Sequence, residues 1–173
     1  MNDQQQRRGP GGRIIKSAFF QLASWLAYGL LASLYERVAT IFSNGEWGRW
    51  RRQAIVELHE QTARAGRARP RILEVGCGTG ALLAELSDAG SVVMGLDRSP
   101  QMLQAAARRL RGARLARVIP VQGMAQATPL PAGSVDGIVL TFPTAYIFDR
   151  RTWQEFGRLL APDGCVIWVD SGQ

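Results

Sequence analysis

Cysteine, histidine and lysine are scarce in this sequence of 173 residues. The two cysteines, Cys77 and Cys165, lie far apart and lack the short spacing that is typical of metal ligands. Two cysteines also cannot build the disulfide framework of a small secreted protein. We therefore expect no metal site and a reduced, cytoplasmic compartment.

Histidine and lysine each occur once, as His59 and Lys16, so arginine carries nearly all the basic charge. The net charge of +7 is compatible with affinity for nucleic acid or for an anionic membrane surface. No basic patch has the signature of a DNA- or RNA-binding motif, so we expect solvated arginines and no nucleic-acid partner. His59 falls in a helical pattern, where a lone histidine is more often a hydrogen-bonded structural group than a base.

Charge is absent from Ser17 to Tyr35, a run of 19 residues that is near the length needed to cross a bilayer as a helix. Polar residues recur along this run at helical spacing, which suits a helix packed on protein or lying in a membrane interface. Three interpretations remain: a packed helix, which we favour, a membrane-surface contact from Ile14 to Tyr35, and a true span. No small-residue cleavage site follows the run, which argues against a secretory signal.

Composition divides the chain into three parts. Residues 1–13 are polar and glycine-rich and predict a disordered tail, residues 14–69 predict the apolar helix and a second helix, and residues 70–173 form the remaining domain. In the second helix, the arginines Arg49, Arg51 and Arg52 are expected mostly on the outer side, away from apolar positions such as Leu58.

From Pro70 onward, short apolar runs alternate with helical patterns. The expected strands are 71–75, 91–97, 115–121, 135–141 and 165–169, and the expected helices between them are 79–88, 99–111 and 149–160. Ser99-Pro100 and Asp149 are helix-start signals, and Gly90 is a stop signal. Strands that alternate with helices need crossover connections, so we expect an α/β fold with a parallel, doubly wound sheet covered on both faces.

The most informative stretch is the turn Gly76-Cys77-Gly78-Thr79-Gly80-Ala81, which follows the first strand and opens a helix. Glycine permits positive φ and lets a ligand approach the backbone, and the helix start offers unpaired N–H groups. Asp97 ends the next strand about 20 residues on, where an acid would hold ribose hydroxyls. A phosphate-binding P-loop is excluded because the Gly-Lys-Ser/Thr ending is missing.

Glu74 helps to choose between the nucleotide-like ligands that remain. NAD would suit the glycine turn and Asp97, but an acid just before the turn would repel its pyrophosphate. A cationic sulfonium ligand that also carries an amino group is the better electrostatic match.

Four motifs resemble those of one family, the class I S-adenosylmethionine-dependent methyltransferases of type 11, which include the ubiquinone/menaquinone C-methyltransferases. In this sequence they are 73–80 (LEVGCGTG), 95–102 (GLDRSPQM), 129–139 (PLPAGSVDGIV) and 155–164 (EFGRLLAPDG), in the family's order. The resemblance covers about Ile72 to Asp170, and 47–51 (WGRWR) is similar to the helix before the first motif. It implies a Rossmann-like sheet with the strand order 3-2-1-4-5, preceded by N-terminal helices.

The resemblance also implies S-adenosylmethionine as the cofactor. Gly76, Gly78 and Gly80 would wrap its methionine end, Glu74 would orient the loop and the amino group, and Asp97 would accept hydrogen bonds from the ribose hydroxyls. Arg98, Met102, Met124 and Ala125 would lie beside the adenine, and Cys77 and Thr141 complete the predicted cofactor-binding set. In the family an acid usually follows Gly123 and meets the adenine amino group, whereas this chain has Met124 there.

The segment 141–148 follows the fourth strand and is the expected lining of the methyl-transfer site. Tyr146 is the candidate catalytic residue, which would orient the acceptor or take a proton indirectly, and the alternative is that it is a packed aromatic. Phe142-Pro143-Thr144 is a poor match to the motif of amino-methylating nucleic-acid enzymes. The apolar surroundings favour a small hydrophobic acceptor, such as a quinone precursor or a lipid.

The sequence ends just after the expected fifth strand, where the family normally adds an antiparallel strand pair. An uncovered apolar strand is a pairing liability. Three interpretations stay open: a natural short form, a homodimer that covers the strand edge, and a truncated product. The leading function is an active methyltransferase, and the alternative is a non-catalytic cofactor-binding module, for which membrane association through the N-terminal helix stays open.

Overall fold

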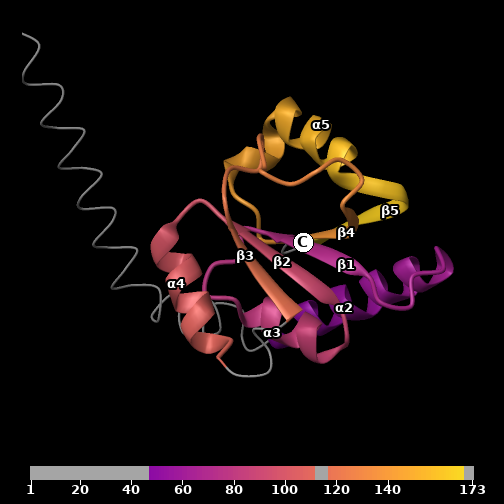
Figure 1. Ribbon diagram of the computed structural model, residues 1–173, viewed down its shortest axis with the longest axis horizontal. Coiled ribbons are helices and arrows are strands. Elements are labelled where there is room, and N and C mark those ends of the chain that lie inside the picture. Colours follow the sequence, from indigo (N-terminus) through magenta and orange to yellow (C-terminus); the bar gives the residue numbers. More distant parts are fainter. Residues whose placement is uncertain (1–46, 112–116, 170–173) are drawn as a thin grey trace, which may run out of the picture.

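The computed structural model describes residues 47–111 and 117–169, and these residues form one sheet with helices on both faces (Figure 1). The strands are β1 (Arg71–Val75), β2 (Val92–Asp97), β3 (Val118–Gln122), β4 (Val135–Thr141) and β5 (Leu160–Val169). All neighbouring strands are parallel, and their order is β3-β2-β1-β4-β5. The expected α/β architecture and strand order are confirmed.

Two apolar clusters hold the helices against the sheet. The helices are α2 (Trp47–Arg64), α3 (Ala81–Asp88), α4 (Pro100–Arg109) and α5 (Arg150–Leu159), with a short 3-10 helix η2 (Ala145–Phe148). Leu58, Leu83 and Ala106 place α2, α3 and α4 on one face, and Phe156 places α5 on the other. Figure 1 shows the same division. Helices on both faces are what right-handed crossovers between parallel strands produce.

The expected helix signals act where the sequence places them. The Ser99 hydroxyl accepts a hydrogen bond from the Met102 N–H at 3.3 Å, and Pro100 occupies the first helical position of α4. The Asp149 carboxylate accepts from the Arg151 N–H at 3.0 Å at the start of α5. Gly90 follows α3 with a φ of 99°. The Ser99 and Asp149 caps satisfy N–H groups that the first turn of each helix leaves unpaired.

The fifth strand departs from its predicted bounds. The prediction ends the helix at Leu160 and starts the strand at Cys165, whereas α5 ends at Leu159 and β5 starts at once. Leu160 pairs with Val135 and Cys165 with Gly137, with an irregularity between the two pairs. Asp163 has a φ of 61°, so the expected turn forms as a bulge inside the strand. Pairing with β4 on both sides of the turn makes the strand longer than its apolar run.

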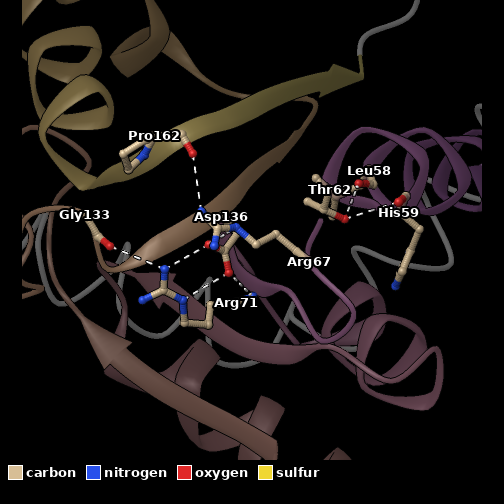
Figure 2. Close-up of polar contacts among 8 residues, drawn as sticks. All are labelled: Leu58, His59, Thr62, Arg67, Arg71, Gly133, Asp136 and Pro162. Atoms are coloured by element: carbon tan, nitrogen blue, oxygen red, sulfur yellow. Dashed lines mark hydrogen bonds and ion pairs between the residues drawn. The ribbon is translucent and has the colours of Figure 1, made fainter. Parts of the chain in front are cut away.

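A buried carboxylate fixes the amino end of the sheet. Asp136 in β4 accepts hydrogen bonds from the Arg71 backbone N–H at 2.8 Å and from its Nε and Nη2 at 3.0 and 2.8 Å. Arg67 adds an ion pair at 3.4 Å, and Figure 2 shows both guanidinium groups converging on the carboxylate. The hydrogen bonds from Arg71 hold the pKa of Asp136 below its ordinary value. We call Arg67, Arg71 and Asp136 the basal clamp.

The single histidine is a hydrogen-bonded structural group, as expected. His59 Nδ1 lies 2.8 Å from the Ile55 carbonyl oxygen, and Nε2 lies 3.1 Å from the Ser91 hydroxyl. The neighbouring Thr62 hydroxyl donates to the Leu58 carbonyl at 2.8 Å (Figure 2). These bonds lie on α2, toward the amino end of the sheet and away from the glycine turn.

Several expectations fall outside the described residues. They are the tail 1–13, the uncharged run with its three interpretations, Gly112 as a helix end and Leu115 as the start of the third strand. Among the helices that the structure does describe, none has the length and apolarity needed to cross a membrane.

Candidate functional site

The glycine turn joins β1 to α3 at the carboxyl edge of the sheet. The N–H groups of Gly76 and Cys77 donate to the Leu96 carbonyl at 2.8 and 3.0 Å, which ties the turn to β2. Gly78 has a φ of 52°, and a Cβ added there would meet no atom within 4 Å. A Cβ on Gly80 would lie 2.9 Å from the Ala106 Cβ. Gly78 therefore leaves open space for a ligand, whereas Gly80 permits close packing of α3 on α4.

Asp97 ends β2 directly opposite this turn. One carboxylate oxygen accepts from the Gly78 N–H at 2.9 Å and the other from the Ser99 N–H at 2.8 Å. Each carboxylate oxygen has a second lone pair. The side chain is thus fixed in place by the backbone and can still accept two hydroxyl donors.

Glu74 is the unusual group of the site. It is 3% exposed, and its Oε2 has no hydrogen-bond partner among the described residues. Burial raises the pKa of Glu74 to about 8, against the guanidinium of Arg51, which lowers it. A buried carboxylate oxygen that has no hydrogen-bond partner is costly. The arrangement suits a ligand that brings a cationic donor.

Cys77 takes part in the turn through its backbone. Its side chain is 5% exposed and belongs to the core cluster on the α3 face, and a Cβ on Gly95 would lie 3.0 Å from its sulfur. Burial raises the pKa of the thiol, so it stays protonated at neutral pH. Any contact of Cys77 with a cofactor would come from its N–H or carbonyl group.

The other predicted cofactor residues follow the ends of neighbouring strands. Arg98 is exposed just after β2, Met102 is buried in the first turn of α4, Met124 and Ala125 follow β3, and Thr141 ends β4. The Gly123 N–H donates to the Asp97 carbonyl at 3.1 Å, which brings the segment after β3 beside Asp97. Met124 is 50% exposed, whereas Ala125 is buried. The structure thus places the predicted set along one edge of the sheet.

Tyr146 in η2 lies against the glycine turn. Its hydroxyl donates to the Val75 carbonyl at 3.3 Å, and a Cβ on Gly76 would lie 3.5 Å from the hydroxyl oxygen. Burial raises the pKa of Tyr146, with a contribution from the charge of Glu74, so the group stays a neutral donor. This geometry suits positioning better than proton abstraction.

Aromatic side chains border the same edge. The rings of Trp50 in α2 and Phe142 after β4 have centroids 5.5 Å apart, and Phe148 in η2 is 84% exposed. Phe142 is one of two described non-glycine residues with positive φ, at 49°. These groups give the end of β4 an apolar border.

Sequence reasoning missed Arg51. The expectation of a solvent-facing arginine is wrong, because its side chain is only 19% exposed and its Nη2 pairs with Glu85 in α3 at 3.1 Å. Its Nε is buried without a hydrogen-bond partner among the described residues. The apolar pattern of α2 does not distinguish Arg51 from the neighbouring arginines. Its similarity to the family's pre-motif helix was the one available signal.

The arrangement fits the cofactor that the sequence motifs imply. S-adenosylmethionine carries ribose hydroxyls, which Asp97 can accept, and an ammonium group, which the free Oε2 of Glu74 can accept. The open Gly78 allows close approach to the backbone. The position after Gly123 offers an apolar surface in Met124 in place of a carboxylate.

Comparison with known proteins agrees with this geometry. Residues 72–164, more than half of the chain, match the family model described as a methyltransferase domain. The chain is 32% identical over 146 residues to the ubiquinone/menaquinone biosynthesis C-methyltransferase UbiE of Syntrophotalea carbinolica, covering 83% of this chain and 59% of that protein. It is 34% identical over 143 residues to the demethylmenaquinone methyltransferase of Thermus thermophilus, covering 81% and 62%. The chain thus spans less than two thirds of either relative.

Solved structures share the fold. The YcgJ protein of Bacillus subtilis superposes with a TM-score of 0.54 at 25% identity, over 65% of this chain and 50% of that one. The PH0226 protein of Pyrococcus horikoshii superposes with a TM-score of 0.55 at 22% identity, over 69% and 58%. Together with the family match and the glycine turn that lies within it, this makes the chain a member of the methyltransferase-domain family, in its class I, S-adenosylmethionine-dependent branch.

Proposed function

We propose that this chain binds S-adenosylmethionine at the carboxyl edge of its sheet and transfers the methyl group to a small hydrophobic acceptor. The observation that supports it most strongly is the buried Oε2 of Glu74, which has no hydrogen-bond partner among the described residues. Glu74 lies two residues before the first glycine of the turn, so its free oxygen lies where the amino group of a methionine moiety is expected. A pyrophosphate would not stabilise the ionised form of this carboxyl group, whereas an ammonium group would, which argues against NAD.

The chain's own residues would hold the cofactor by three kinds of contact. Asp97 accepts the ribose hydroxyls while the Gly78 and Ser99 N–H groups keep its carboxylate in place. Glu74 accepts the ammonium group. The apolar surface of Met124, at the end of β3, covers the adenine.

When bound, S-adenosylmethionine supplies an electrophilic methyl group on a sulfonium sulfur. In the transfer, a nucleophilic atom of the acceptor forms a bond to the methyl carbon, the carbon–sulfur bond breaks with its electron pair staying on sulfur, and the acceptor loses a proton. Placing the two reactants in line and excluding water accounts for most of such catalysis. Phe142 and Tyr146, which border the edge, would exclude water and orient the acceptor.

The acceptor is proposed to be a quinone precursor or a similar lipid-like ring. Two relatives are named for ubiquinone/menaquinone biosynthesis and for demethylmenaquinone. The exposed Phe148 and Met124 give the site apolar surface that matches such a molecule. The second candidate is a module that binds the cofactor without turnover, which the residues at the β1 and β2 ends would also support.

Titration calorimetry with S-adenosylmethionine, S-adenosylhomocysteine and NAD tests the cofactor. We expect the first two to bind and NAD to give no heat. Binding of NAD without a response to the other two would overturn the proposal.

Transfer of labelled methyl groups tests the acceptor. We expect incorporation into a demethylated quinone or a lipid extract and none into RNA. Incorporation into RNA alone would refute the hydrophobic acceptor. Cofactor binding with no transfer to any quinone or lipid would favour the non-catalytic module.

Location and partners are part of the proposal. We propose a cytoplasmic protein, peripheral to the membrane through Ile14 to Tyr35, whose β5 edge is covered by a second copy. Among the described strands, β5 pairs only with β4, so its other edge is available for a second copy. Cell fractionation tests the first, and sedimentation of the purified chain tests the second, where a monomer at micromolar concentration would refute it.

A further inference from the structure

The exposed aromatic side chains lie on a small part of the molecular surface. In the part of the chain that the structure describes, the large aromatic side chains that are exposed are Phe148 in η2, Trp153 in α5 and Trp168 in β5. Phe148 is 84% exposed, although the residue before it, Ile147, is buried. Single exposed apolar residues are ordinary, whereas a group of them on one surface marks a contact site.

Hydrogen bonding and strand register place all three on one face of the sheet. The Trp153 indole N–H donates to the Ile147 carbonyl at 2.8 Å, so its ring lies against η2, beside the residue that precedes Phe148. Trp168 pairs with Leu140 of β4, which belongs to the apolar cluster under α5. Because paired residues of neighbouring strands point to the same face, Trp168 lies on the α5 face. The three side chains therefore share this face near the carboxyl edge of the sheet.

Arginines in the first turn of α5 border these aromatic side chains. Arg150 and Arg151 are both exposed. Arg151 pairs with Asp149 at 2.8 Å, whereas Arg150 has no ion-pair partner within the described ranges. Arg150, Trp153 and Gln154 recur at helical spacing and are all exposed, so they form one stripe of α5. This stripe joins an unpaired cation to an exposed aromatic ring.

The chemistry of this surface matches the interface of an anionic lipid bilayer. The indole N–H of Trp153 is satisfied by Ile147, so the exposed part of its ring is apolar. Aromatic rings settle at the level of the lipid headgroups, and arginine is attracted to anionic lipid. A nucleic acid would need several phosphate contacts, and this surface offers one unpaired arginine. A second copy docked on this face would bring two Arg150 side chains into one symmetric interface, where like charges repel.

The same surface adjoins the acceptor side of the site. Tyr146 and Phe148 belong to the same short helix η2, and the Tyr146 hydroxyl lies 3.3 Å from the Val75 carbonyl beside the glycine turn. The buried Thr152 hydroxyl donates to the Tyr146 carbonyl at 2.7 Å, which fixes η2 on α5. A hydrophobic molecule that leaves a bilayer at Phe148 would therefore reach the methyl-transfer edge along η2.

We infer that η2, the first turns of α5 and the carboxyl end of β5 form a docking surface for an anionic lipid bilayer. Phe148 and Trp153 enter the headgroup layer, and Arg150 pairs with the anionic headgroups. The inference deepens the proposed function, on which it rests for the hydrophobic acceptor. It adds a membrane contact on the α/β domain to the contact proposed for residues 14–35.

Flotation of the purified full chain with lipid vesicles tests this surface. Wild type should bind vesicles made of equal parts of phosphatidylglycerol and phosphatidylcholine more tightly than vesicles of phosphatidylcholine alone. Phe148→Ser should lower the partition coefficient about 10-fold, because an apolar side chain no longer enters the interface. Arg150→Gln should lower it roughly fivefold on the anionic vesicles and leave it unchanged on the neutral ones.

Matched control variants lie away from this surface. Ile119→Ser removes an exposed apolar side chain from β3, at the opposite edge of the sheet. Arg108→Gln removes an exposed arginine from the last turn of α4. Both variants should bind vesicles as wild type does. Circular dichroism checks that each variant is folded, and should Phe148→Ser fail to fold, Arg150→Gln on the two kinds of vesicle still decides.

Each other outcome has a defined meaning. No flotation of wild type, or flotation that neither Phe148→Ser nor Arg150→Gln lowers, would overturn the inference. Equal binding to both kinds of vesicle would overturn the anionic partner. A loss of self-association in Phe148→Ser, with vesicle binding unchanged, would show an interface between copies instead. Calorimetry with S-adenosylhomocysteine needs no lipid, so a failure of the docking surface and a failure of the proposed cofactor are measured separately.

Discussion

Glu74 shows how the fold can hold a carboxyl group in a buried position, although such a group is more stable in water. A carboxyl group at the end of a buried strand loses its hydration, and two neighbouring acids add to the cost of ionising it. The fold keeps the group there because β1 must be buried on both faces in a parallel sheet. In the ligand-free protein the proton stays on until the pH approaches 8, and a cationic ligand would remove it.

The first prediction is a pH-dependent stability that depends on Glu74. Its pKa of about 8 lies above the ordinary value of 4.5, so between these values the folded state holds a proton that the unfolded state has released. The free energy of unfolding should therefore fall as the pH rises from about 5 to 8. Urea unfolding at several pH values measures the slope, and Glu74→Gln should make it shallower.

The charged and titratable neighbours of Glu74 do not obscure this test. Arg51, Asp97 and Glu85 act on its pKa, while burial raises the pKa of Cys77 and of Tyr146 out of the window. Equal slopes in wild type and Glu74→Gln would contradict the assignment.

The second prediction separates two roles of glycine. Gly80 has a φ of 76°, and an added Cβ would lie 2.9 Å from the Ala106 Cβ. Gly133 has a φ of 62° with nothing within 4 Å of such an atom. Left-handed backbone costs an alanine roughly 1–2 kcal/mol, so Gly133→Ala should lose about that much and Gly80→Ala at least ~1 kcal/mol more. Denaturant unfolding of both variants measures the difference. Equal losses would show that α4 moves away from the added methyl group without a loss of stability.

At the scale of elements, the loop before β4 is tied to α5. The Thr128 N–H and hydroxyl donate to Glu155 at 2.7 and 2.8 Å, and Arg158 donates to the Leu130 carbonyl at 2.9 Å. The hydrogen bond from Arg158 lowers the pKa of Glu155 to about 2. This loop follows Met124 and Ala125, so α5 indirectly fixes the segment expected beside the adenine.

The third prediction concerns the basal clamp. Asp136→Asn leaves Arg67 and Arg71 without their buried anion and should lower the free energy of unfolding by about 2 kcal/mol, less than a fully buried pair because Arg71 is half-exposed. The pKa of Asp136 is lowered in the folded state, so this stability is present above its ordinary value and is lost as the pH falls. Urea unfolding at pH 7 and at pH 3 measures both effects.

A matched control for the clamp lies on α2. The exposed pair of Arg64 and Glu60, at 3.5 Å, is of the kind that contributes little. Glu60→Gln should change the free energy of unfolding by less than about 0.5 kcal/mol. A comparable loss in both variants would mean that the basal clamp stabilises the fold no more than an exposed ion pair does. Binding of S-adenosylhomocysteine should survive in Asp136→Asn, since the clamp lies at the opposite end of the sheet.

At the scale of the whole molecule, cofactor binding should stabilise the fold, because the site draws on the ends of four strands. The fourth prediction is that S-adenosylhomocysteine at 100 times its dissociation constant adds about 2.7 kcal/mol. For a chain of this size that corresponds to a rise in Tm of roughly 5–10 °C. Thermal unfolding with and without ligand measures it, with NAD at the same concentration as the control. An equal rise with NAD would contradict the assignment.

The sequence by itself determined the order of elements and the kind of site. Its evidence was the alternation of apolar runs, the caps at Ser99 and Asp149, and the glycine turn. These are local signals, which depend only on residues that are close together in the sequence. They predicted the parallel sheet, its order through the family resemblance, and the line of candidate residues from Glu74 to Tyr146. Where local rules and long-range pairing disagreed, as at the start of β5, the sequence prediction was wrong.

Only the tertiary structure decided what surrounds each side chain. It covered most of the Arg51 side chain and paired it with Glu85, although an arginine on an amphipathic helix is expected in water. It turned the Cys77 thiol into the core and set the Tyr146 hydroxyl on the Val75 carbonyl. These outcomes depend on which helices pack on which strands, and contacts between residues distant in sequence leave no periodic trace in the chain. Burial and partner geometry, which set the pKa of Glu74, therefore could not be predicted from the pattern alone.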